Sequence, residues 1–465
     1  MLNCNLKKLL VGVLMLVLIF TSLSCSLLSN PSPNPPPSTS SNSSPSNPST
    51  NPSQTNTPSN EQSTIPDLIP YRKGNKWGFC DKNKNIVIQP IYDQVGFFSE
   101  GLASVSVKGN YGYSLSWKGQ CGYIDTKGNM VIKPVYEDAE SFSDGLAAVR
   151  LNGKYGYIDT KGNFFIPPKY NYAESFSNGL GRIEIGGKWG FVDKNGNLVV
   201  KPECGYADPF SNGFAKVIIN GKFGVIDTKG NFVIPPKYDD TYSFYEGPIF
   251  EFSEPRLCDL AAVKLNGKWG FVDKKGKIVI PIQYDDASPF SEGLAVVKFN
   301  GKWIIVDKKG NTVIQLEYDS VGSFSEGLAM VRINGKYGYI NKSGNLVIKP
   351  DYDTARPFSN GLAVVLLNGK GWGYIDTKGN IVIQPVYEDA DCFSDGLAAV
   401  KLNGKYGYID TKGNIVIQPK YAEADPFSNI FNKGLKGLAF VGDDNDGSGY
   451  IDKNGTEYWN SGYSK

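Results

Sequence analysis

Apolar and polar positions alternate in short runs over most of the chain, and the same arrangement returns at a nearly fixed interval. For example, Asn403-Gly404 separates two runs rich in Val, Ile, Leu and Tyr, and Asn-Gly favours a tight type I′ hairpin turn. A second, glycine-containing turn at residues 410–414 leads into a third apolar run. The pattern predicts a three-stranded meander in each unit, with Pro419 ending the hydrogen-bond ladder because proline has no amide proton.

The interval between units is visible in the acidic or amide residue that ends each second strand. Most intervals are 34 residues and a few are longer, a range typical of solenoids, propellers and other arrays. Because no segment has a helical apolar period of useful length, we predict an all-β fold. The acidic or amide residues that mark the units are Asp81, Asp125, Asp159, Asp193, Asp227, Asp273, Asp307, Asn341, Asp376, Asp410 and Asp452.

The predicted architecture is a repeat array of about eleven units of about 34 residues. We expect the units to form an open, elongated, solenoid-like stack in which each unit contacts only its neighbours. A closed, β-propeller-like arrangement is the alternative, although eleven units exceed the usual four to eight blades.

Two aromatic columns recur in register with the units. In the first, an aromatic residue precedes a glycine, and we expect the ring of one unit to cover the glycine of its neighbour. The second is a phenylalanine in the connector after the third strand. Rings of this size bury about 150–250 Å² each, so we expect the second column to form the core between units. The columns include Trp77-Gly78, Trp189-Gly190, Trp269-Gly270 and Trp372-Gly373 in the first, and Phe290, Phe324 and Phe358 in the second.

These repeated segments resemble a known bacterial family. Residues 266–280 read NGKWGFVDKKGKIVI and residues 284–295 read YDDASPFSEGLA, which is similar to the WG repeat, named for its Trp-Gly pair. The resemblance extends from about Tyr71 to the C-terminus. It implies an all-β repeat domain of the kind found in exported or multi-domain bacterial proteins, and it implies no catalytic residue.

The first 24 residues have the parts of an export signal. Lys7 and Lys8 precede an apolar run that is followed by small residues, which together predict a signal peptide over residues 1–24. The end of this segment resembles a bacterial lipobox, with Ser22 in the place of the usual leucine. The resemblance implies that Cys25 carries a lipid.

The next stretch, residues 25–64, is dominated by Ser, Asn, Pro and Thr. Such a composition cannot bury enough apolar area to fold, so we expect a disordered tether. The WG-repeat β domain is then predicted over residues 65–465. This order of segments predicts a membrane-anchored lipoprotein of the cell envelope, or a secreted protein if Cys25 is not modified.

The residue types present narrow the possible chemistry. The chain has no histidine, which removes His-containing nucleophilic sites and the most common general base, and its cysteines lack metal-ligand spacing. Adjacent carboxylates recur in many units, whereas a glycosidase needs two carboxylates facing each other across a cleft. We therefore predict a non-enzyme without a cofactor, and a carboxylate-dependent hydrolase is the remaining catalytic alternative. The pairs include Asp239-Asp240, Asp285-Asp286 and Glu388-Asp389.

One segment near the C-terminus resembles a calcium-binding loop. Asp444, Asp446 and Asp452 have the spacing of acidic ligands, but Gly455 stands where such a loop carries a bidentate glutamate. Residues 449–452 are also in register with a strand of the preceding unit. We therefore predict no metal site, and these three aspartates are the calcium candidate.

The net charge of the chain and the insertions into its repeats indicate which partners it can bind. The 48 basic and 46 acidic residues are interleaved and give a net charge of +2, so we predict no nucleic-acid partner and a membrane contact only through lipid at Cys25. Irregular insertions into repeats often carry binding groups, which makes Trp117, Phe250 and Phe252 the binding candidates. The predicted function is a lipid-anchored cell-surface scaffold that binds an extracellular protein or polysaccharide. An adhesin that binds cell-wall polysaccharide is the alternative.

Overall fold

The computed structural model describes residues 66–108, 120–242, 244–246, 256–427, 437–444 and 447–460. The contacts of the chain divide it into two units, residues 1–60 and 61–465, and the described residues all belong to the second. The predicted export signal, Cys25, the tether, Trp117, Phe250, Phe252 and Asp446 lie outside the described residues. The described residues form strands and turns without a helix, which confirms the all-β prediction. They therefore contain no helix of the length and apolar character needed to span a membrane.

Each repeat folds into a small antiparallel sheet, called a blade below, whose strands follow the order of the chain. The second and third strands are joined by the predicted hairpin turn. In the turn between β39 (Leu397–Leu402) and β40 (Lys405–Asp410), Asn403 has φ 51° and Gly404 has φ 77°, as a type I′ turn requires. The connector adds a short strand on the inner side of the sheet, so most blades have four strands rather than the predicted three.

The strands fall into four classes by their place in the blade. The inner strands are β4 (Gln94–Val95), β8 (Asp138–Ala139), β12 (Tyr172–Ala173), β16 (Tyr206–Ala207), β20 (Asp240–Thr241), β26 (Asp286–Ala287), β30 (Ser320–Ser325), β34 (Thr354–Ala355), β38 (Asp389–Ala390) and β42 (Glu423–Ala424). The second strands are β1 (Ile69–Lys73), β5 (Leu102–Val107), β9 (Leu146–Leu151), β13 (Leu180–Ile185), β17 (Phe214–Ile219), β23 (Leu260–Leu265), β27 (Leu294–Phe299), β31 (Leu328–Ile333), β35 (Leu362–Leu367), β39 and β43 (Leu438–Gly442).

The third and outer strands complete the blades. The third strands are β2 (Lys76–Cys80), β6 (Gln120–Asp125), β10 (Lys154–Asp159), β14 (Lys188–Asp193), β18 (Lys222–Asp227), β24 (Lys268–Asp273), β28 (Lys302–Asp307), β32 (Lys336–Asn341), β36 (Gly371–Asp376), β40 and β44 (Ser448–Asp452). The outer strands are β3 (Ile86–Tyr92), β7 (Met130–Tyr136), β11 (Phe164–Tyr170), β15 (Leu198–Cys204), β19 (Phe232–Tyr238), β25 (Ile278–Tyr284), β29 (Thr312–Leu316), β33 (Leu346–Tyr352), β37 (Ile381–Tyr387) and β41 (Ile415–Tyr421). A small ribbon of β21 (Tyr245–Glu246) and β22 (Arg256–Leu257) lies in the insertion between β20 and β23.

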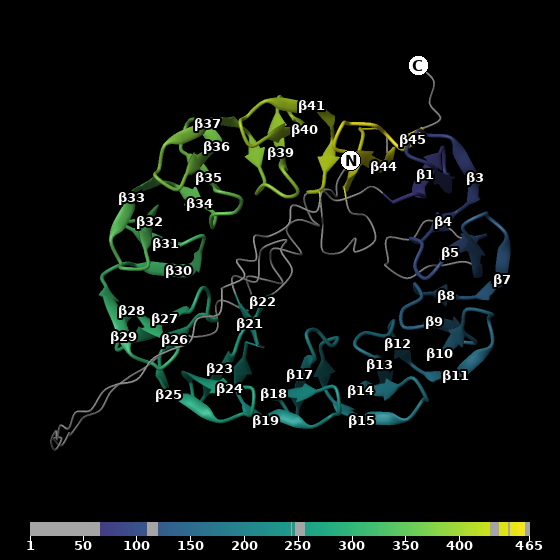
Figure 1. The fold of residues 1–465 in the computed structure, drawn as a ribbon, viewed down its shortest axis with the longest axis horizontal. Coiled ribbons are helices and arrows are strands. Elements are labelled where there is room, and N and C mark those ends of the chain that lie inside the picture. Colours follow the sequence, from purple (N-terminus) through teal and green to yellow (C-terminus); the bar gives the residue numbers. More distant parts are fainter. Residues whose placement is uncertain are drawn as a thin grey trace, which may run out of the picture. The chain divides into compact units, whose positions relative to one another are not determined.

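The blades follow one another around a closed ring, with the short inner strands toward the centre and the outer strands at the rim (Figure 1). Ten sheets have four strands, and the sheet of β42, β43 and β44 has three. The ring closes through β45 (Trp459–Asn460), which pairs in parallel with β1 through Arg72↔Trp459 and Lys73↔Asn460. The structure thus corrects the expected open stack to its alternative, a closed propeller, because the C-terminal strand completes the first blade.

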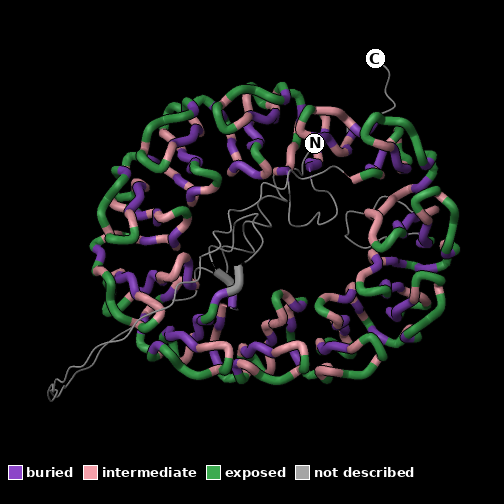
Figure 2. Tube along the Cα trace, in the orientation of Figure 1, coloured by how far each residue is buried: buried purple, intermediate pink, exposed green. Residues whose placement is uncertain are grey.

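The hydrophobic core is divided into packets that each lie between two neighbouring blades. In one packet, Tyr123 of β6 meets Phe142, which follows β8, with ring centroids 4.8 Å apart. Phe290, Phe324 and Phe358 occupy the same position in later blades and are at most 1% exposed. The outer strands at the rim are largely exposed, whereas most residues of the second and third strands are buried (Figure 2). Each blade therefore buries its apolar side chains only with the help of its neighbours.

Serine side chains add a hydrogen bond across many of these junctions. Ser291 Oγ donates to the carbonyl oxygen of Phe324 at 2.6 Å, and Ser143 Oγ donates to that of Phe176 at 2.8 Å. Each serine follows the phenylalanine of its own connector, so the connectors of adjacent blades are linked in series. The same bond joins Ser99 to Phe142, Ser177 to Phe210, Ser325 to Phe358, and Ser394 to Phe427.

The glycine after each aromatic residue makes room for the outer strand of its own blade. A Cβ atom on Gly156 would lie 2.5 Å from the Ile166 carbonyl oxygen and 2.7 Å from the Pro168 nitrogen, both in β11. The pairing of β10 with β11 shifts register between Tyr155 and Tyr157, on either side of this glycine. The expectation that a neighbouring ring covers the glycine is therefore wrong, because a bulge in the outer strand occupies that space.

The proline of the repeat lies inside this bulge. Pro419 is within β41, so the prediction that it ends the ladder is also wrong. An outer strand tolerates proline because a bulged edge strand does not need that amide proton for pairing. Trp77, Trp189, Trp269 and Trp372 precede Gly78, Gly190, Gly270 and Gly373, which make the same close approach to the backbone of β3, β15, β25 and β37.

The blade of β26 to β29 lacks both the glycine after the aromatic residue and the bulge opposite it. Its Trp303 is followed by Ile304 instead of glycine, and Leu316 stands where most outer strands carry proline. Here Ile304 pairs directly with Gln315, and the register runs without a shift from Trp303 to Ile305. The glycine and the bulge opposite it are thus absent together.

Candidate functional site

Two adjacent blades carry an aromatic residue at a position where four other blades carry an acid–base pair. The blades of β12–β15 and β16–β19 carry tyrosine at the first position of the inner strand, where Tyr172 pairs with Glu184 and Tyr206 with Ile218. In four other blades this position is an aspartate opposite a basic residue, namely Asp138↔Arg150, Asp240↔Lys264, Asp286↔Lys298 and Asp389↔Lys401. Aromatic rings therefore replace an acid–base pair at two adjacent blades.

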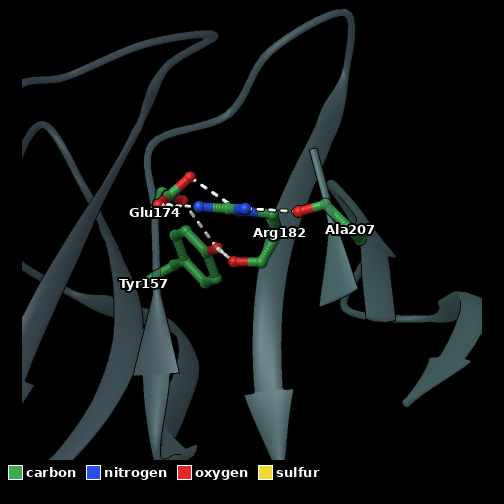
Figure 3. Close-up of polar contacts among 4 residues, drawn as sticks. All are labelled: Tyr157, Glu174, Arg182 and Ala207. Carbon is green, nitrogen blue, oxygen red and sulfur yellow. Dashed lines mark hydrogen bonds and ion pairs between the residues drawn. The ribbon is translucent and has the colours of Figure 1, made fainter. Parts of the chain in front are cut away.

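Arg182 in β13 links these two blades (Figure 3). Its Nε donates to Glu174 Oε2 at 2.8 Å, its Nη2 forms an ion pair with Glu174 Oε1, and its Nη1 donates to the Ala207 carbonyl oxygen in the next blade. Its guanidinium carbon lies 4.3 Å from the centroid of the Trp189 ring, a distance typical of cation–π contact. Arg182 is thus held on three sides, and it fixes β13 against β16.

The backbone of Glu174 is held by a contact that recurs around the ring. Tyr157 Oη donates to the Glu174 carbonyl oxygen at 2.8 Å (Figure 3), and burial raises the pKa of Tyr157, which keeps this donor protonated. The equivalent bond joins Tyr123 to Glu140, Tyr339 to Arg356, Tyr374 to Asp391, and Tyr408 to Asp425. The repeat therefore positions Glu174, and the pairing with Arg182 is particular to this blade.

Aromatic rings continue on both sides of Arg182. The ring centroids of Tyr155 and Tyr172 are 5.2 Å apart, and those of Tyr172 and Trp189 are 5.8 Å apart. Beyond them, Tyr206 is 42% exposed, and burial and the neighbouring Asp208 carboxylate raise its pKa. Tyr206 interacts with Arg182 and pairs with Ile218. Gly205, Tyr206 and Ile218 are called the Tyr206 surface below.

Glu140 lies one blade before this arrangement. Burial, followed by the charges of Asp138 and Glu174, raises the pKa of Glu140 to about 7. The β9 residue that corresponds to Arg182 is Ala148, so Glu140 lacks the cation that Glu174 has. The Glu140 carboxyl therefore changes charge near neutral pH, in the blade next to the one that carries Arg182.

The adjacent carboxylates noted in the sequence hold backbone groups. Asp285 Oδ2 accepts the Gly301 N–H at 3.1 Å in the hairpin turn of its blade, and Asp286 Oδ1 accepts the Ala287 N–H at 2.9 Å. Asp239 with Asp240, and Glu388 with Asp389, make the same two kinds of contact. The two members of a pair therefore serve two different parts of the backbone.

The two described aspartates of the calcium candidate, Asp444 and Asp452, have protein partners. Asp452 Oδ1 accepts the N–H groups of Asn454 and Thr456, and its Oδ2 accepts the Tyr458 hydroxyl at 3.1 Å. Asp444 forms an ion pair with Lys405. Within the part of the chain that the structure describes, no three acidic or cysteine side chains gather closely enough to hold a metal ion.

The closed ring of four-stranded blades defines the protein as a β-propeller. The WG containing repeat family matches ten segments, which cover more than half of the sequence, and the chain belongs to this family. The matched residues are 77–111, 122–155, 155–189, 189–223, 223–269, 269–303, 305–337, 337–370, 372–406 and 406–429. No curated protein sequence is a significant match to the chain.

Several solved structures are similar at low sequence identity. One is a eukaryotic initiation factor, with 12% identity over 68% of this chain and 95% of that chain and a TM-score of 0.41. Another is the computationally designed Ika8 protein, with 12% identity over 59% of this chain and 93% of that chain and a TM-score of 0.29. A third is BamB from Moraxella catarrhalis, with 12% identity over 62% of this chain and 92% of that chain and a TM-score of 0.26.

Sequence reasoning that looked only at insertions missed the Tyr206 surface. A comparison of repeat columns contains the signal, because Arg182 stands in a column where most blades have a small or apolar residue. Likewise, Tyr206 stands in a column where several blades have aspartate. The contacts that join these residues across a blade junction are visible only in the fold.

Proposed function

We propose that this chain is an exported, lipid-anchored cell-surface scaffold that binds an extracellular protein or polysaccharide and performs no catalysis. An export-like leader and a Ser/Asn/Pro/Thr-rich segment before the repeats support the envelope location. The engagement of the acidic pairs with backbone groups supports a structural role for those carboxylates. A ring of related blades also offers many equivalent surface positions, which suits binding.

The observation that carries the binding proposal is the Tyr206 surface. Tyr206 is exposed, and the next residue, Ala207, is held by Arg182, which itself lies over the Trp189 ring. Tyrosine, tryptophan and arginine are the residues that contribute most often to binding energy at interfaces. A rigid base also reduces the entropy lost when a partner binds. The replacement of charge by aromatic rings at this one junction is therefore expected to serve a partner.

The binding proposal is tested by introducing the charge pair that four other blades carry. In the variant Tyr206→Asp with Ile218→Lys, the blade of β16–β19 carries the pair that Asp286 and Lys298 form elsewhere. The matched control is Lys298→Ala, which alters the same column in another blade. Retention is measured on a glycan array and on immobilised surface proteins of the producing cells. Loss of retention in the first variant alone supports the proposal, and equal retention in both variants contradicts it.

The anchoring proposal has a separate test. We expect the protein made in a bacterium with a lipoprotein pathway to enter the membrane fraction and to carry an acyl-modified Cys25 by intact mass. The Cys25→Ser variant is then expected in the soluble fraction. A mature wild-type chain that begins at an unmodified Cys25 would show a secreted protein instead.

A further inference from the structure

Seven hairpins of this chain have the same turn sequence, Asn-Gly-Lys. They begin at Asn152, Asn220, Asn266, Asn300, Asn334, Asn368 and Asn403. Asn-Gly is also the sequence in which an asparagine most readily loses its side-chain amide, because glycine leaves the following backbone nitrogen unhindered. Since the residues that take part are the same in all seven turns, a difference in reactivity between them must come from the fold.

Six of the seven turns share their backbone geometry. Asn220 has φ 51°, and Asn152, Asn300 and Asn403 have φ 50°, 49° and 51°. These asparagines are held in the left-handed region, and each must open locally before its side chain can reach the next nitrogen. Asn368 is the exception, because it has no positive φ and its turn is one residue longer, with Lys370 before β36. What opposes this opening is the hydrogen bonding of the turn itself.

In six of the seven turns, a carboxylate from the preceding crossover accepts a backbone N–H of the turn. Glu388 accepts the Gly404 N–H at 3.1 Å and Asp285 accepts the Gly301 N–H at 3.1 Å. Glu137 holds Gly153 and Asp239 holds Gly267 in the same way, while Asp319 and Asp353 accept the N–H groups of Asn334 and Asn368. A carboxylate in this position pins the turn, and its negative charge opposes loss of the amide proton.

The turn at Asn220 lacks this carboxylate. The corresponding crossover residue is Gly205, whose own N–H donates to the Ile218 carbonyl oxygen. Among the described residues, none accepts a hydrogen bond from the backbone N–H of Asn220 or Gly221. Asn220 is also exposed, so water and base reach it freely.

We propose that Asn220 is a modification site, at which deamidation in water is faster than at the six capped turns. Base removes the proton from the Gly221 backbone nitrogen, which attacks Cγ of Asn220. The new C–N bond closes a succinimide, the bond to the side-chain nitrogen breaks, and ammonia leaves with a proton from solvent. Water then adds to either carbonyl of the ring and yields aspartate or isoaspartate, so one water is consumed for each ammonia released.

The product changes the charge of the hairpin that carries part of the Tyr206 surface. Aspartate at position 220 adds a negative charge to the hairpin of β17 and β18, the same hairpin that carries Ile218 opposite Tyr206. Isoaspartate also lengthens the backbone of a two-residue turn by one carbon, which disturbs the pairing of Ile219 with Lys222. The inference does not depend on the binding proposal.

The test uses the folded full-length protein in mildly alkaline buffer, with peptide mapping by mass spectrometry over time. Because a hydrogen bond to a charged group changes an equilibrium by about ten-fold or more, we expect Asn220 to react about ten-fold faster than Asn403. In concentrated urea, all seven sites should react at similar rates. Equal rates for Asn220, Asn300 and Asn403 in the folded protein would overturn the proposal.

Substitutions at two positions distinguish the effect of the carboxylate on the deamidation rate from the effects of other features of the turn. Gly205→Asp supplies the missing acceptor, and a side chain fits there because its Cβ would lie 3.6 Å from the nearest atom. We expect it to slow Asn220 to the rate of Asn300. Glu388→Gln and Glu388→Ala should accelerate Asn403 and leave Asn220 unchanged, with circular dichroism confirming that each variant is folded. An unchanged Asn220 rate in folded Gly205→Asp contradicts the proposal.

Discussion

At the scale of single residues, the glycine after the aromatic column determines the path of the outer strand. In nine blades the outer strand shifts register opposite this glycine. The space is already full, since a Cβ atom on Gly122 would lie 2.4 Å from the Ile132 carbonyl oxygen. Trp-Gly is therefore a packing motif of the blade, and the tryptophan need not act on a ligand for the pair to recur.

Adding one methyl group at this glycine is expected to destabilise the ring. Gly156→Ala places Cβ against backbone atoms of β11, so we expect the free energy of unfolding to fall by about 1–3 kcal/mol. Urea denaturation followed by tyrosine and tryptophan fluorescence measures the change. Gly205→Ala is the control, because its Cβ meets only the Ile218 carbonyl oxygen at 3.6 Å. An equal effect of the two substitutions would argue against the bulge as the cause.

The half-buried Glu140 makes stability depend on pH. Its pKa is raised from 4.5 to about 7, mainly by burial, so between these values the folded state binds more protons than the unfolded state. The free energy of unfolding therefore falls as pH rises through this window and levels off above about pH 7. In Glu140→Gln this decline should disappear, with a gain of roughly 2–3 kcal/mol over the wild type above pH 7. Thermal unfolding between pH 4 and 8 measures it.

The exposed Glu317 provides the control for this measurement. Its side chain is 87% exposed, so Glu317→Gln should leave the pH profile of the wild type unchanged. A Glu140→Gln profile that runs parallel to that of the wild type between pH 5 and 7 would show that another group controls this window.

At the scale of elements, each blade is joined to the next by side chains more than by strand pairing. The phenylalanine of the connector enters the packet between two blades, and the serine after it donates to the next connector. The outer strands end each sheet and carry exposed apolar side chains such as Val87 and Ile91. Their prolines and bulges oppose further strand pairing at this edge.

Removal of one serine hydroxyl should weaken one junction. Ser291 is 6% exposed, and Ser291→Ala leaves the Phe324 carbonyl oxygen without this donor in a buried place. We expect a loss of about 1–3 kcal/mol in the free energy of unfolding. Ser343→Ala, in an exposed turn, should change it by less than about 0.5 kcal/mol. If both variants unfold at the same urea concentration as the wild type, the junction does not depend on this bond.

At the scale of the whole molecule, the ring closes through a short C-terminal segment. Tyr458 is fully buried and its hydroxyl donates to Asp452 and to the Lys82 carbonyl oxygen, which belongs to the first blade. Trp459 pairs with Arg72 of β1. One core packet also joins the two ends of the chain, with Ile69 and Tyr71 beside Leu438. The seam is thus built from apolar packing, two residue pairs of strand register and a few hydrogen bonds, among them that of Arg72 Nη1 to Ser448 Oγ at 2.9 Å.

Loss of these two aromatic side chains is expected to open the ring. Tyr458→Ala with Trp459→Ala removes buried rings, each worth about 3–5 kcal/mol. We expect a larger maximum dimension in small-angle scattering, with the β signal in circular dichroism retained because the other blades still pack in pairs. Phe232→Ala, on a side chain that is 48% exposed, is the control. An unchanged scattering curve for the double variant would place the closure elsewhere.

Much of the blade follows from the sequence alone. Asn403-Gly404 predicts its turn because few residues accept the positive φ values that a type I′ turn needs. The alternation of apolar and polar positions likewise predicts strands, and the absence of histidine excludes whole classes of catalysis without any structure. These features are local, so a short stretch of sequence contains all the information they require.

The closure of the ring and the candidate site were decided only by the tertiary structure. Whether successive units form an open stack or a ring depends on a small rotation summed over eleven blades and on the pairing of β45 with β1, residues almost 400 positions apart. Arg182 illustrates the same limit, because its acceptor Ala207 and its neighbour Tyr206 belong to the next blade. The sequence by itself determined the repeating blade and its turns. The ring and the contacts between blades depend on long-range geometry that no local pattern contains.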